Sequence, residues 1–267
     1  MKNILYLALL LLLISCAPAA DSAIGILANE AYEIPIKLAY KAELLAENEL
    51  GIKNYSSSEY LLKALLNQDL ALAILPLNIL SQNPSATPKL KKLAYYQREG
   101  FAIASADVQY QEVAVLQNSL AALLLENLLR KQEVDFRLRY FSKVADLQKA
   151  LARGEINAVC LKIPQLFQFE NLPHKIWLSQ YYGRYPNSIL VTTQAAYEAN
   201  PSYFQTKLEQ ISSAVQLYNQ DLPLAKAAAA SFAQIAATDL ETFIYQTRFI
   251  ISYEAAGKDF ERMIFAQ

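Results

Sequence analysis

The residue types that carry out covalent and metal chemistry are scarce in this sequence. The single histidine, His174, follows Pro173 and has no serine, cysteine or carboxylate motif beside it, so a Ser-His-Asp or Cys-His site has little support. Two cysteines, Cys16 and Cys160, with one histidine are too few for a zinc site. The six glycines form no GxGxxG motif and no P-loop. The sequence therefore predicts no metal, no cofactor and no catalytic residue, which counts against an enzyme.

Polar and aromatic side chains instead follow the segments that we expect to be strands. In an open α/β sheet, ligands bind beyond the carboxyl ends of the strands, beside helix N-termini. Free N–H groups and hydroxyls there suit a polar or anionic ligand group, and aromatic rings suit a flat or apolar body. The candidate ligand-binding residues, beside Pro76 and Pro164 at the same strand ends, are Asn29, Glu30, Tyr32, Ser56, Ser57, Ser58, Asn78, Asn118, Ser119, Phe141, Ser142, Gln165, Tyr181, Tyr182 and Arg184.

Each candidate also has a purely structural interpretation. Serines that precede helices, such as Ser56, Ser119 and Ser142, are helix caps first. Tyrosine is abundant, with 17 residues, so a given tyrosine more often packs at a core edge or at the surface. Arg184 could pair with an anionic ligand or stand in a solvated loop, and Glu30 could meet a cationic group.

The first residues have the pattern of an export signal. Met1-Lys2-Asn3 precedes an apolar run from Ile4 to Ile14, which is too short for a membrane span. The run ends in Leu13-Ile14-Ser15-Cys16, a lipobox, in which a lipid is attached to the cysteine and the chain is cut before it. We expect residues 1–15 to be a lipoprotein signal peptide and Cys16 to anchor an exported protein to a membrane, in the periplasm or at the cell surface. The alternative is an ordinary signal peptide with a chance cysteine.

Composition points to a globular protein with a sizeable core. The chain is 54% hydrophobic and 18% charged, and no later stretch is long and apolar enough for a transmembrane helix. A net charge of -1 without a basic run argues against nucleic acid as a partner. Cys160 lies in an apolar run and is expected to be an inert core thiol, with no second cysteine for an intramolecular disulfide in the mature chain. We expect a monomer.

An internal sequence repeat indicates a duplicated strand–helix–strand unit. Residues 55–76 and 140–164 each contain a serine-bearing loop, a helix with Lys-Ala-Leu, a polar turn and a buried strand that ends near a proline. Gly154 fits a left-handed cap at the exit of the second helix. Strands at 51–55 and 136–140 precede the two copies, so each copy makes a parallel βαβ unit.

Local signals place the remaining helix starts and strands. Ser56 and Glu59 fit a capping box, Ser142 is a plausible cap in the second copy, and Asn118 or Ser119 could cap the helix 120–131. The preceding strand–helix pairs are predicted at 24–28 with 35–47, and at 113–116 with 120–131.

The segments outside the two units have different signatures. Residues 93–96 and 101–104 indicate a hairpin-like pair of strands around the turn 98–100. A strand at 188–193 precedes a long helix that begins at Asn200-Pro201. Helices are predicted for 222–237 and from 239 onward, where Thr238 and Glu241 fit a capping box, and this tail is expected to pack on the first half.

Three stretches carry a resemblance to a known family. They are Lys63-Ala64-Leu65 through Ala73-Ile74-Leu75-Pro76, then Leu151 to Ala158, and then Tyr185 to Thr193 followed by Glu198-Ala199-Asn200-Pro201. In this order, behind a lipobox, they resemble the type 2 periplasmic substrate-binding proteins of ABC importers, in the branch that binds sulfonates, nitrate, taurine and thiamine precursors. The likeness covers nearly all of the mature chain.

The resemblance implies an α/β fold of two lobes, each a mostly parallel sheet flanked by helices, joined by two crossovers near 104–107 and 183–186. Lobe I would comprise residues 16–105 and 187–267, and lobe II residues 106–186. A small organic molecule, sulfonate-, nitrate- or thiamine-precursor-like, would be captured in the cleft by hinge closure and passed to an ABC permease.

One segment departs from the family pattern. The loop Val115-Leu116-Gln117-Asn118-Ser119 lacks the glycines that let the backbone approach a small anion closely. Two alternatives remain open: an enzyme on the same bilobal fold, of a pyrimidine-forming or menaquinone-pathway type, and a signalling or structural lipoprotein without a solute.

Overall fold

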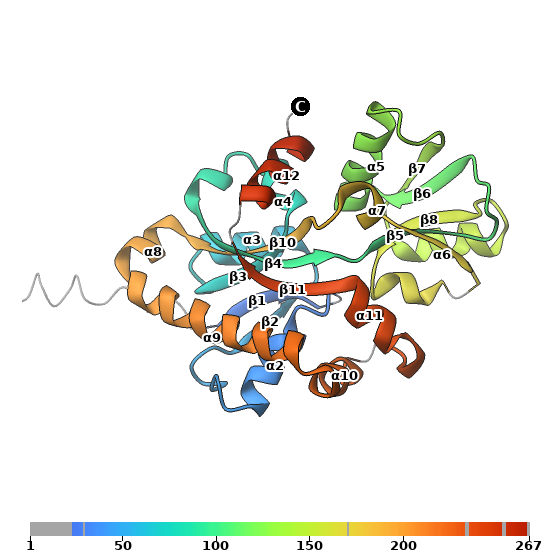
Figure 1. Ribbon diagram of the computed structural model, residues 1–267. Coiled ribbons are helices and arrows are strands. Elements are labelled where there is room, and N and C mark those ends of the chain that lie inside the picture. The colour runs from blue at the N-terminus through green and yellow to red at the C-terminus, as the bar shows by residue number, and fades with distance from the viewer. Residues whose placement is uncertain (1–22, 29, 170, 233–234, 253–254, 266–267) are drawn as a thin grey trace, which may run out of the picture.

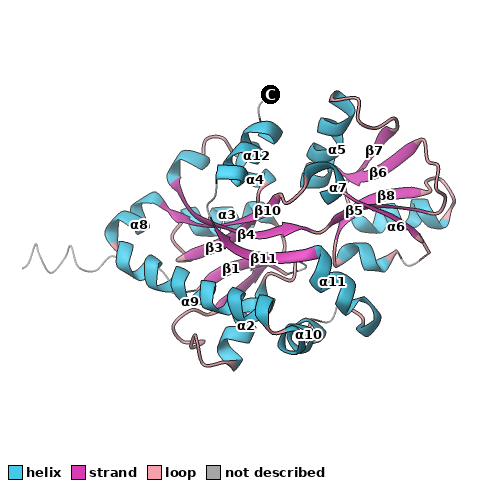
Figure 2. Ribbon diagram, viewed as in Figure 1, coloured by secondary structure: helices cyan, strands magenta, loops and turns pink. Residues whose placement is uncertain are grey.

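The computed structural model describes residues 23–28, 30–169, 171–232, 235–252 and 255–265 (Figure 1). The predictions for the signal segment 1–15, for Cys16 and for Asn29 lie outside the described residues. In the described part, strands form two separate sheets with helices on both faces of each, which gives two lobes side by side (Figure 2). None of the described helices combines the length and the hydropathy needed to cross a bilayer.

The sheet of lobe I has the strand order β11-β4-β10-β3-β1-β2 among the described residues. Its strands are β1 (Ile24–Leu27), β2 (Ile52–Tyr55), β3 (Leu72–Pro76), β4 (Leu90–Glu99), β10 (Pro186–Thr193) and β11 (Thr247–Ser252). β1 pairs in parallel with β2 and β3, whereas β10 pairs antiparallel with β3 and β4, and β11 pairs antiparallel with β4.

The sheet of lobe II has the order β7-β6-β8-β5-β9 among the described residues. Its strands are β5 (Phe101–Ser105), β6 (Glu112–Leu116), β7 (Arg137–Phe141), β8 (Ala158–Lys162) and β9 (His174–Trp177). β6 pairs in parallel with β7 and β8, and β5 pairs antiparallel with β8 and β9. The prediction of mostly parallel sheets is therefore wrong: both sheets are mixed. Parallel pairs are confined to the strands of the βαβ units.

Helices flank both sheets. They are α2 (Glu33–Lys41), α3 (Ser58–Leu66), α4 (Asn78–Gln82), α5 (Leu120–Arg130), α6 (Val144–Ala152), α7 (Ser179–Tyr182), α8 (Gln194–Ala199), α9 (Pro201–Gln220), α10 (Leu222–Ala230), α11 (Leu240–Gln246) and α12 (Ala255–Phe265). Short 3-10 turns lie at Thr87–Lys89, Gln165–Gln168 and Ala237–Asp239. In lobe II, α5 and α6 cover opposite faces of the sheet (Figure 1).

The helix starts agree only partly with the predicted caps. Ser119 caps α5 by accepting from the Ala122 N–H at 3.1 Å, and Asn200 caps α9 in the same way, as predicted. The cap of α3 is Ser57 rather than Ser56, so the predicted capping box is wrong by one residue. Ser142 does not cap α6, which begins after Lys143 without a side-chain cap.

The predicted helix ends and the capping box predicted near residue 239 also agree only partly with the structure. Gly154 has a φ of +67°, as the predicted left-handed exit of α6 requires. The helix predicted for 35–47 ends at Lys41. α11 has Asp239 as its N-cap without a side-chain hydrogen bond, so the capping box predicted from Thr238 and Glu241 is not formed.

The core lies on both faces of the sheets because alternate strand residues point in opposite directions. In β3, Leu72 and Ile74 pack in the cluster that contains α2, α9 and α10, while Ala73 and Leu75 pack in the cluster that contains α3. All four side chains are fully buried. This arrangement leaves the strand ends, rather than the strand faces, as the places where a ligand can bind.

The first passage between the lobes differs from its prediction. β4 and β5 lie in different sheets and do not pair with each other, so the predicted hairpin is wrong. Glu99 and Gly100, with φ values of +61° and +86°, carry the chain from one sheet to the other (Figure 1). Residues 101–105 therefore pair in the sheet of lobe II, and the first crossover precedes the predicted 104–107. The second passage, at residues 183–185 between α7 and β10, lies where it was predicted.

The C-terminal part contains a strand that the sequence pattern did not indicate. β11 occupies residues predicted as helix, although its Thr, Phe and Ile residues are common in strands, and it pairs with β4. α9, α10 and β11 pack on lobe I, as expected for the tail.

α12, in contrast, contacts both lobes. Glu261 accepts from Tyr95 Oη at 2.6 Å and pairs with Lys92, both on β4 of lobe I. Phe260 stacks on Tyr185, with ring centroids 5.4 Å apart, and packs edge-on against Tyr182 of α7 in lobe II. α12 is therefore a strap across the junction of the lobes (Figure 1).

The packing of β1 against α3 gives a stability prediction. A Cβ atom at Gly25 would lie 2.3 Å from Leu61 Cδ1 and 2.5 Å from Leu70 Cδ1, and both leucines are fully buried. We expect Gly25→Ala to lower the free energy of unfolding by about 1–3 kcal/mol, because the core has to move to accept the methyl group. Urea denaturation curves of the variant and the parent protein measure the difference.

Gly51→Ala is the matched control. Its added Cβ would lie 3.6 Å from the Glu47 carbonyl oxygen, an ordinary contact. The control should change the free energy of unfolding by less than about 0.5 kcal/mol. Equal effects of the two substitutions would contradict the close packing of β1 on α3.

Candidate functional site

A cavity of about 180 Å³ lies between the lobes at the carboxyl ends of the parallel strands. Leu27 ends β1, Pro76 ends β3, Leu116 ends β6 and Lys162 ends β8, and all four residues line the cavity. Parallel strands bring their carboxyl ends to one edge of a sheet, and the crossovers turn these two edges toward each other.

The cavity wall mixes apolar and polar side chains from both lobes. Its lining residues are Leu27, Glu30, Tyr32, Ser58, Pro76, Asn78, Phe101, Leu116, Ser119, Leu120, Ala121, Cys160, Leu161, Lys162, Gln165 and Asn187. At roughly 30 Å³ per water molecule, the volume corresponds to about six waters. The cavity suits a small solute.

A buried ion pair joins the lobes inside the cavity. Lys162 Nζ of lobe II lies 2.5 Å from Glu30 Oε2 of lobe I, and the two side chains are 6% and 15% exposed. Lys162 Nζ also donates a hydrogen bond to Tyr32 Oη at 3.0 Å and lies 4.4 Å from the centre of the Tyr32 ring. Because Glu30 and Tyr32 follow β1 while Lys162 ends β8, this contact exists only when the lobes lie close together.

Burial changes the acid–base properties of this group. Loss of solvent lowers the pKa of Lys162 below its usual value, and the Glu30 carboxylate acts in the opposite direction without cancelling the effect. Burial, followed by the charge of Glu30, raises the pKa of Tyr32 well above its usual value, so Tyr32 stays neutral. Glu30 and Lys162 are the two charged side chains among the described lining residues, and their opposite charges compensate each other.

Two helices from opposite lobes point their N-termini at the cavity. Ser58 begins α3 in lobe I, and Leu120 and Ala121 begin α5 in lobe II; all three line the cavity. The caps Ser57 and Ser119 occupy the N–H groups of Tyr60 and Ala122. Helix geometry leaves the earlier N–H groups without acceptors inside the helix, and the helix dipoles favour negative charge at this end.

Asn187 presents an acceptor at the cavity wall. Its side chain belongs to a residue that is 1% exposed, and Nδ2 donates to the Glu99 carbonyl oxygen at 2.6 Å. Since a carbonyl only accepts, this bond fixes which end of the amide is the oxygen. Asn187 Oδ1 is buried and has no hydrogen-bond partner among the described residues. Buried acceptors without a partner are rare in folded proteins, which makes Asn187 a candidate to accept from a ligand donor.

A second contact between the lobes lies beside the cavity. Asn78 Nδ2 and Gln82 Nε2 of α4 donate to the Asn118 carbonyl oxygen at 2.7 and 2.6 Å. Asn118 has a φ of +59°, a left-handed conformation that asparagine tolerates. The loop without glycines thus contacts lobe I through its backbone carbonyl.

The structure brings some of the sequence-predicted residues to the cavity. Those that line it are Glu30, Tyr32, Ser58, Asn78, Ser119 and Gln165. Their contact with a ligand stays a prediction. Each stands directly after a strand or at a helix start, which is the pattern on which they were chosen.

Other predicted residues lie elsewhere. Ser56, Ser142, Tyr181 and Arg184 are exposed, and Ser57 serves as the cap of α3. Asn118 borders a neighbouring hollow. Phe141 packs beneath Arg139, and the Tyr182 hydroxyl donates to the Leu124 carbonyl oxygen behind the cavity. His174 begins the edge strand β9.

Sequence reasoning missed Lys162 and Asn187. A lysine that ends the apolar run Ala158–Leu161 is a signal that could have been used, because a charge at that place sits at the carboxyl end of a buried strand. Asn187 had no comparable signal. It lies near the start of β10, and the antiparallel pairing of β10 with β3 brings it to the cavity.

Cys160 lines the cavity but is fully buried. Burial raises the pKa of its thiol far above the usual value, so the reactive thiolate is not formed. Among the described residues, no group of three or more His, Cys, Asp or Glu side chains could hold a metal ion.

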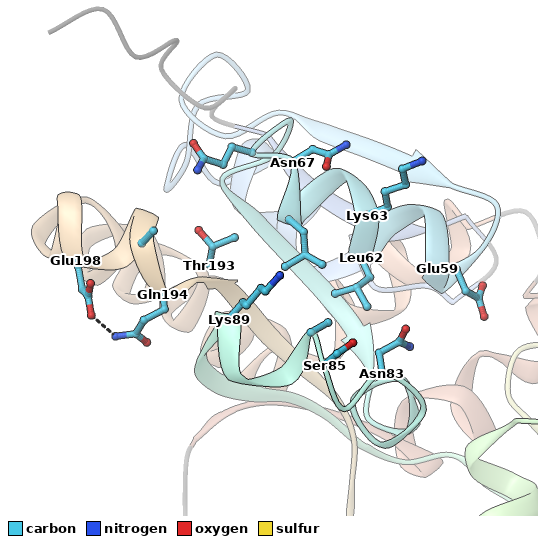
Figure 3. A pocket seen from close by; sticks show the side chains of 14 residues that line it. Glu59, Leu62, Lys63, Asn67, Asn83, Ser85, Lys89, Thr193, Gln194 and Glu198 are labelled. Carbon is cyan, nitrogen blue, oxygen red and sulfur yellow. Dashed lines mark hydrogen bonds between the residues drawn. The ribbon is translucent and has the colours of Figure 1, made fainter. Parts of the chain in front are cut away.

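A larger hollow of about 810 Å³ lies on the outer face of lobe I, between α3, residues 83–89 and α8 (Figure 3). Its charged side chains, such as Lys63 and Glu59, extend from the surface, and Glu198 accepts from Gln194 at 2.7 Å. All of its lining residues belong to lobe I. Because the hollow lacks the second lobe and the buried charges, the cavity between the lobes is the better candidate site.

Comparison of the sequence with protein-family models found no matching family. No curated protein matches the sequence significantly either.

Solved structures, in contrast, match the fold over most of the chain. The ligand-binding component of an ABC-type import system from Staphylococcus aureus, solved with zinc bound, has a TM-score of 0.74 at 14% identity, covering 92% of this chain and 90% of that chain. The periplasmic aliphatic sulphonate binding protein SsuA from Escherichia coli has a TM-score of 0.72 at 16% identity, covering 91% and 90%.

A third similar structure is a Candida albicans protein described as having the generic periplasmic binding protein structural fold. Its TM-score is 0.64 at 12% identity, covering 85% of this chain and 81% of that chain. These likenesses establish the fold: the chain has the bilobal architecture of periplasmic binding proteins, as its sequence resemblance implied.

The burial of Cys160 gives a test of its inertness. In a protein with Cys16→Ser, we expect less than about a tenth of Cys160 to react with a thiol reagent under native conditions, and all of it in denaturant, because the thiol is buried and protonated. Absorbance of the released thiolate measures the reaction.

An exposed cysteine provides the positive control. Ser56→Cys in the same protein adds a thiol at an exposed position, and that thiol should react at once under native conditions. Native reaction of Cys160 at the same rate as the introduced thiol would show that the cavity wall is open to reagents.

Proposed function

We propose that this protein is a solute-binding lipoprotein that captures a small organic molecule between its lobes, outside the cytoplasm, and delivers it to the permease of an ABC importer. The observation that carries the proposal is the cavity where strand ends and helix N-termini of both lobes converge on buried charges. Ligand cavities of this kind combine apolar walls with a few convergent polar groups.

The chemistry of the wall supports a polar solute with an anionic group. Lys162 and the N-termini of α3 and α5 supply donors, while Leu116 and Phe101 offer apolar contact. A sulfonate of a few carbons fits both the donors and the volume of about 180 Å³. The similarity in fold to an aliphatic sulphonate binding protein agrees with this class.

The mechanism that we propose is hinge closure. The two passages near Gly100 and at residues 183–185 connect the lobes, and each lobe supplies part of the cavity wall. A solute that contacts both lobes binds the closed arrangement more tightly than the open one and therefore shifts the population toward it.

No observation favours the enzyme alternative. His174 lies exposed on β9, and Cys160 is buried and protonated, so these two residues do not form a nucleophile–base pair. A thermal-shift screen for solutes tests the alternative of a lipoprotein without a solute.

Binding of the solute should stabilise the fold. At a solute concentration of 100 times Kd, the linkage contributes about 2.7 kcal/mol, which for a protein of this size raises Tm by roughly 5–10 °C. A thermal-shift screen of small sulfonates, carboxylates, amino acids and nitrate measures this. A well-folded protein with no shift across the screen would contradict the proposed role.

A pair of serines tests where the solute binds. Ser58 lines the cavity at the first position of α3, so Ser58→Tyr should fill the space and weaken binding by at least about tenfold, or 1.4 kcal/mol. Ser56 is exposed and does not line the cavity, so Ser56→Tyr should leave the affinity unchanged. Isothermal titration measures both. Equal affinities for the two variants would place the solute elsewhere.

We also propose that residues 1–15 are a signal peptide and that Cys16 carries the lipid. Cells grown with an alkyne-bearing fatty acid should label the protein, and Cys16→Ala should abolish the label and release the protein from membranes. The control Cys160→Ala removes the other thiol and should retain the label. Labelling that persists in Cys16→Ala would contradict the anchor.

A further inference from the structure

We propose, building on the solute-binding role above, that the solute is a small zwitterion. Its cationic end would lie at Glu30 and Asn187, and its anionic end at Lys162 and the N-terminus of α5. The inference comes from the charges and unsatisfied groups of the cavity wall.

An ion pair between Glu30 and Lys162 spans the cavity. Glu30 and Lys162 come from opposite lobes and compensate each other at 2.5 Å. Both side chains line the cavity, so a solute that enters between the lobes meets both charges. Each buried charge then needs a new partner, because an unpaired charge away from water is strongly disfavoured.

Simple ions satisfy only half of this requirement. An anion that pairs with Lys162 brings a second negative charge next to Glu30, and a cation that pairs with Glu30 brings a second positive charge next to Lys162. A zwitterion supplies one partner to each group and adds no net charge to the cavity. It can thus replace the direct ion pair without leaving a charge unpaired.

The side-chain amide oxygen of Asn187 has no hydrogen-bond partner among the described residues. Nδ2 is occupied by the Glu99 carbonyl oxygen, so Oδ1 is the free end, and it has no partner among the described residues. An ammonium group has three N–H donors. It can therefore bond more than one acceptor, and Glu30 and Asn187 are both lining residues of lobe I that carry one.

Lobe II supplies hydrogen-bond donors for the anionic end of the solute. Leu120 and Ala121, the first residues of α5, line the cavity on lobe II together with Lys162, and their N–H groups have no acceptor inside the helix. α5 is an 11-residue helix, so its dipole favours negative charge at this end. Glu30 and Asn187 supply acceptors on lobe I, where α3 also begins, and Lys162 and the start of α5 supply donors on lobe II, so the cavity holds partners for both ends of a zwitterion.

The cavity volume limits the size of that molecule. About 180 Å³ accommodates two charged groups separated by a short carbon chain, as in a small aminosulfonate or amino acid. A sulfonate and a carboxylate share the required anionic chemistry. The experiment therefore uses both.

The decisive comparison uses matched pairs of probes with the wild-type protein. Taurine is compared with ethanesulfonate, and β-alanine with propanoate, so that each pair differs in the ammonium group. We expect the zwitterion of at least one pair to bind at least tenfold more tightly than its simple anion in isothermal titration. Ethylammonium, which lacks the anionic end, should bind at least tenfold more weakly than that zwitterion.

Two cavity variants and two matched controls locate the effect. Glu30→Gln leaves Lys162 without its carboxylate, so it should weaken the zwitterion at least tenfold and strengthen the simple anion. Lys162→Met should weaken both. The controls are Glu33→Gln, whose carboxylate pairs with Lys37 outside the cavity, and Lys175→Met, on the exposed edge of β9. Both controls should leave every affinity unchanged.

The outcomes separate this inference from the proposed role. If a simple anion binds the wild-type protein as tightly as its zwitterionic partner, the zwitterion is excluded while the solute-binding role stands. If the thermal-shift screen finds no solute for the folded protein, both proposals fall. The wild-type comparison decides the question even if a cavity variant does not fold.

Discussion

Two passages of the chain between the sheets, at Gly100 and at residues 183–185, hold the carboxyl edges of both sheets face to face. Neither lobe encloses the cavity alone, because its wall needs the strand ends of β1 and β3 from one side and of β6 and β8 from the other. Lobe I contributes the N-terminus of α3 and lobe II that of α5, so free N–H groups from both lobes meet at one place.

The ion pair between Glu30 and Lys162 depends on this arrangement. Desolvation of both charges offsets much of their attraction, so a buried pair is weak support for stability. Its position is more informative. The pair bridges two lobes rather than two elements of one core, and Tyr32 holds the ammonium from the side. The same groups that keep the lobes together are therefore those that an entering solute has to contact.

The C-terminal helix adds a constraint behind the cavity. Phe260 contacts Tyr182 and Tyr185, while Glu261 contacts Tyr95, so α12 touches both lobes and the second passage between them. Any rotation of one lobe against the other has to be accommodated in this aromatic cluster. Figure 1 shows the strap above the junction, at the end of a chain whose preceding elements pack on lobe I.

The sequence by itself determined the features that depend on neighbours along the chain: the two βαβ units, the caps of α5 and α9, the exit at Gly154, and the polar residues that follow strands, such as Glu30. These are local because backbone geometry and capping are decided within a few residues. Tertiary structure alone decided that β4 and β5 belong to different sheets, that β11 pairs with β4, and that Lys162 and Asn187 line the same cavity as Glu30. The reason is that strand pairing and charge compensation join residues distant in sequence, and no local pattern encodes which of them come together.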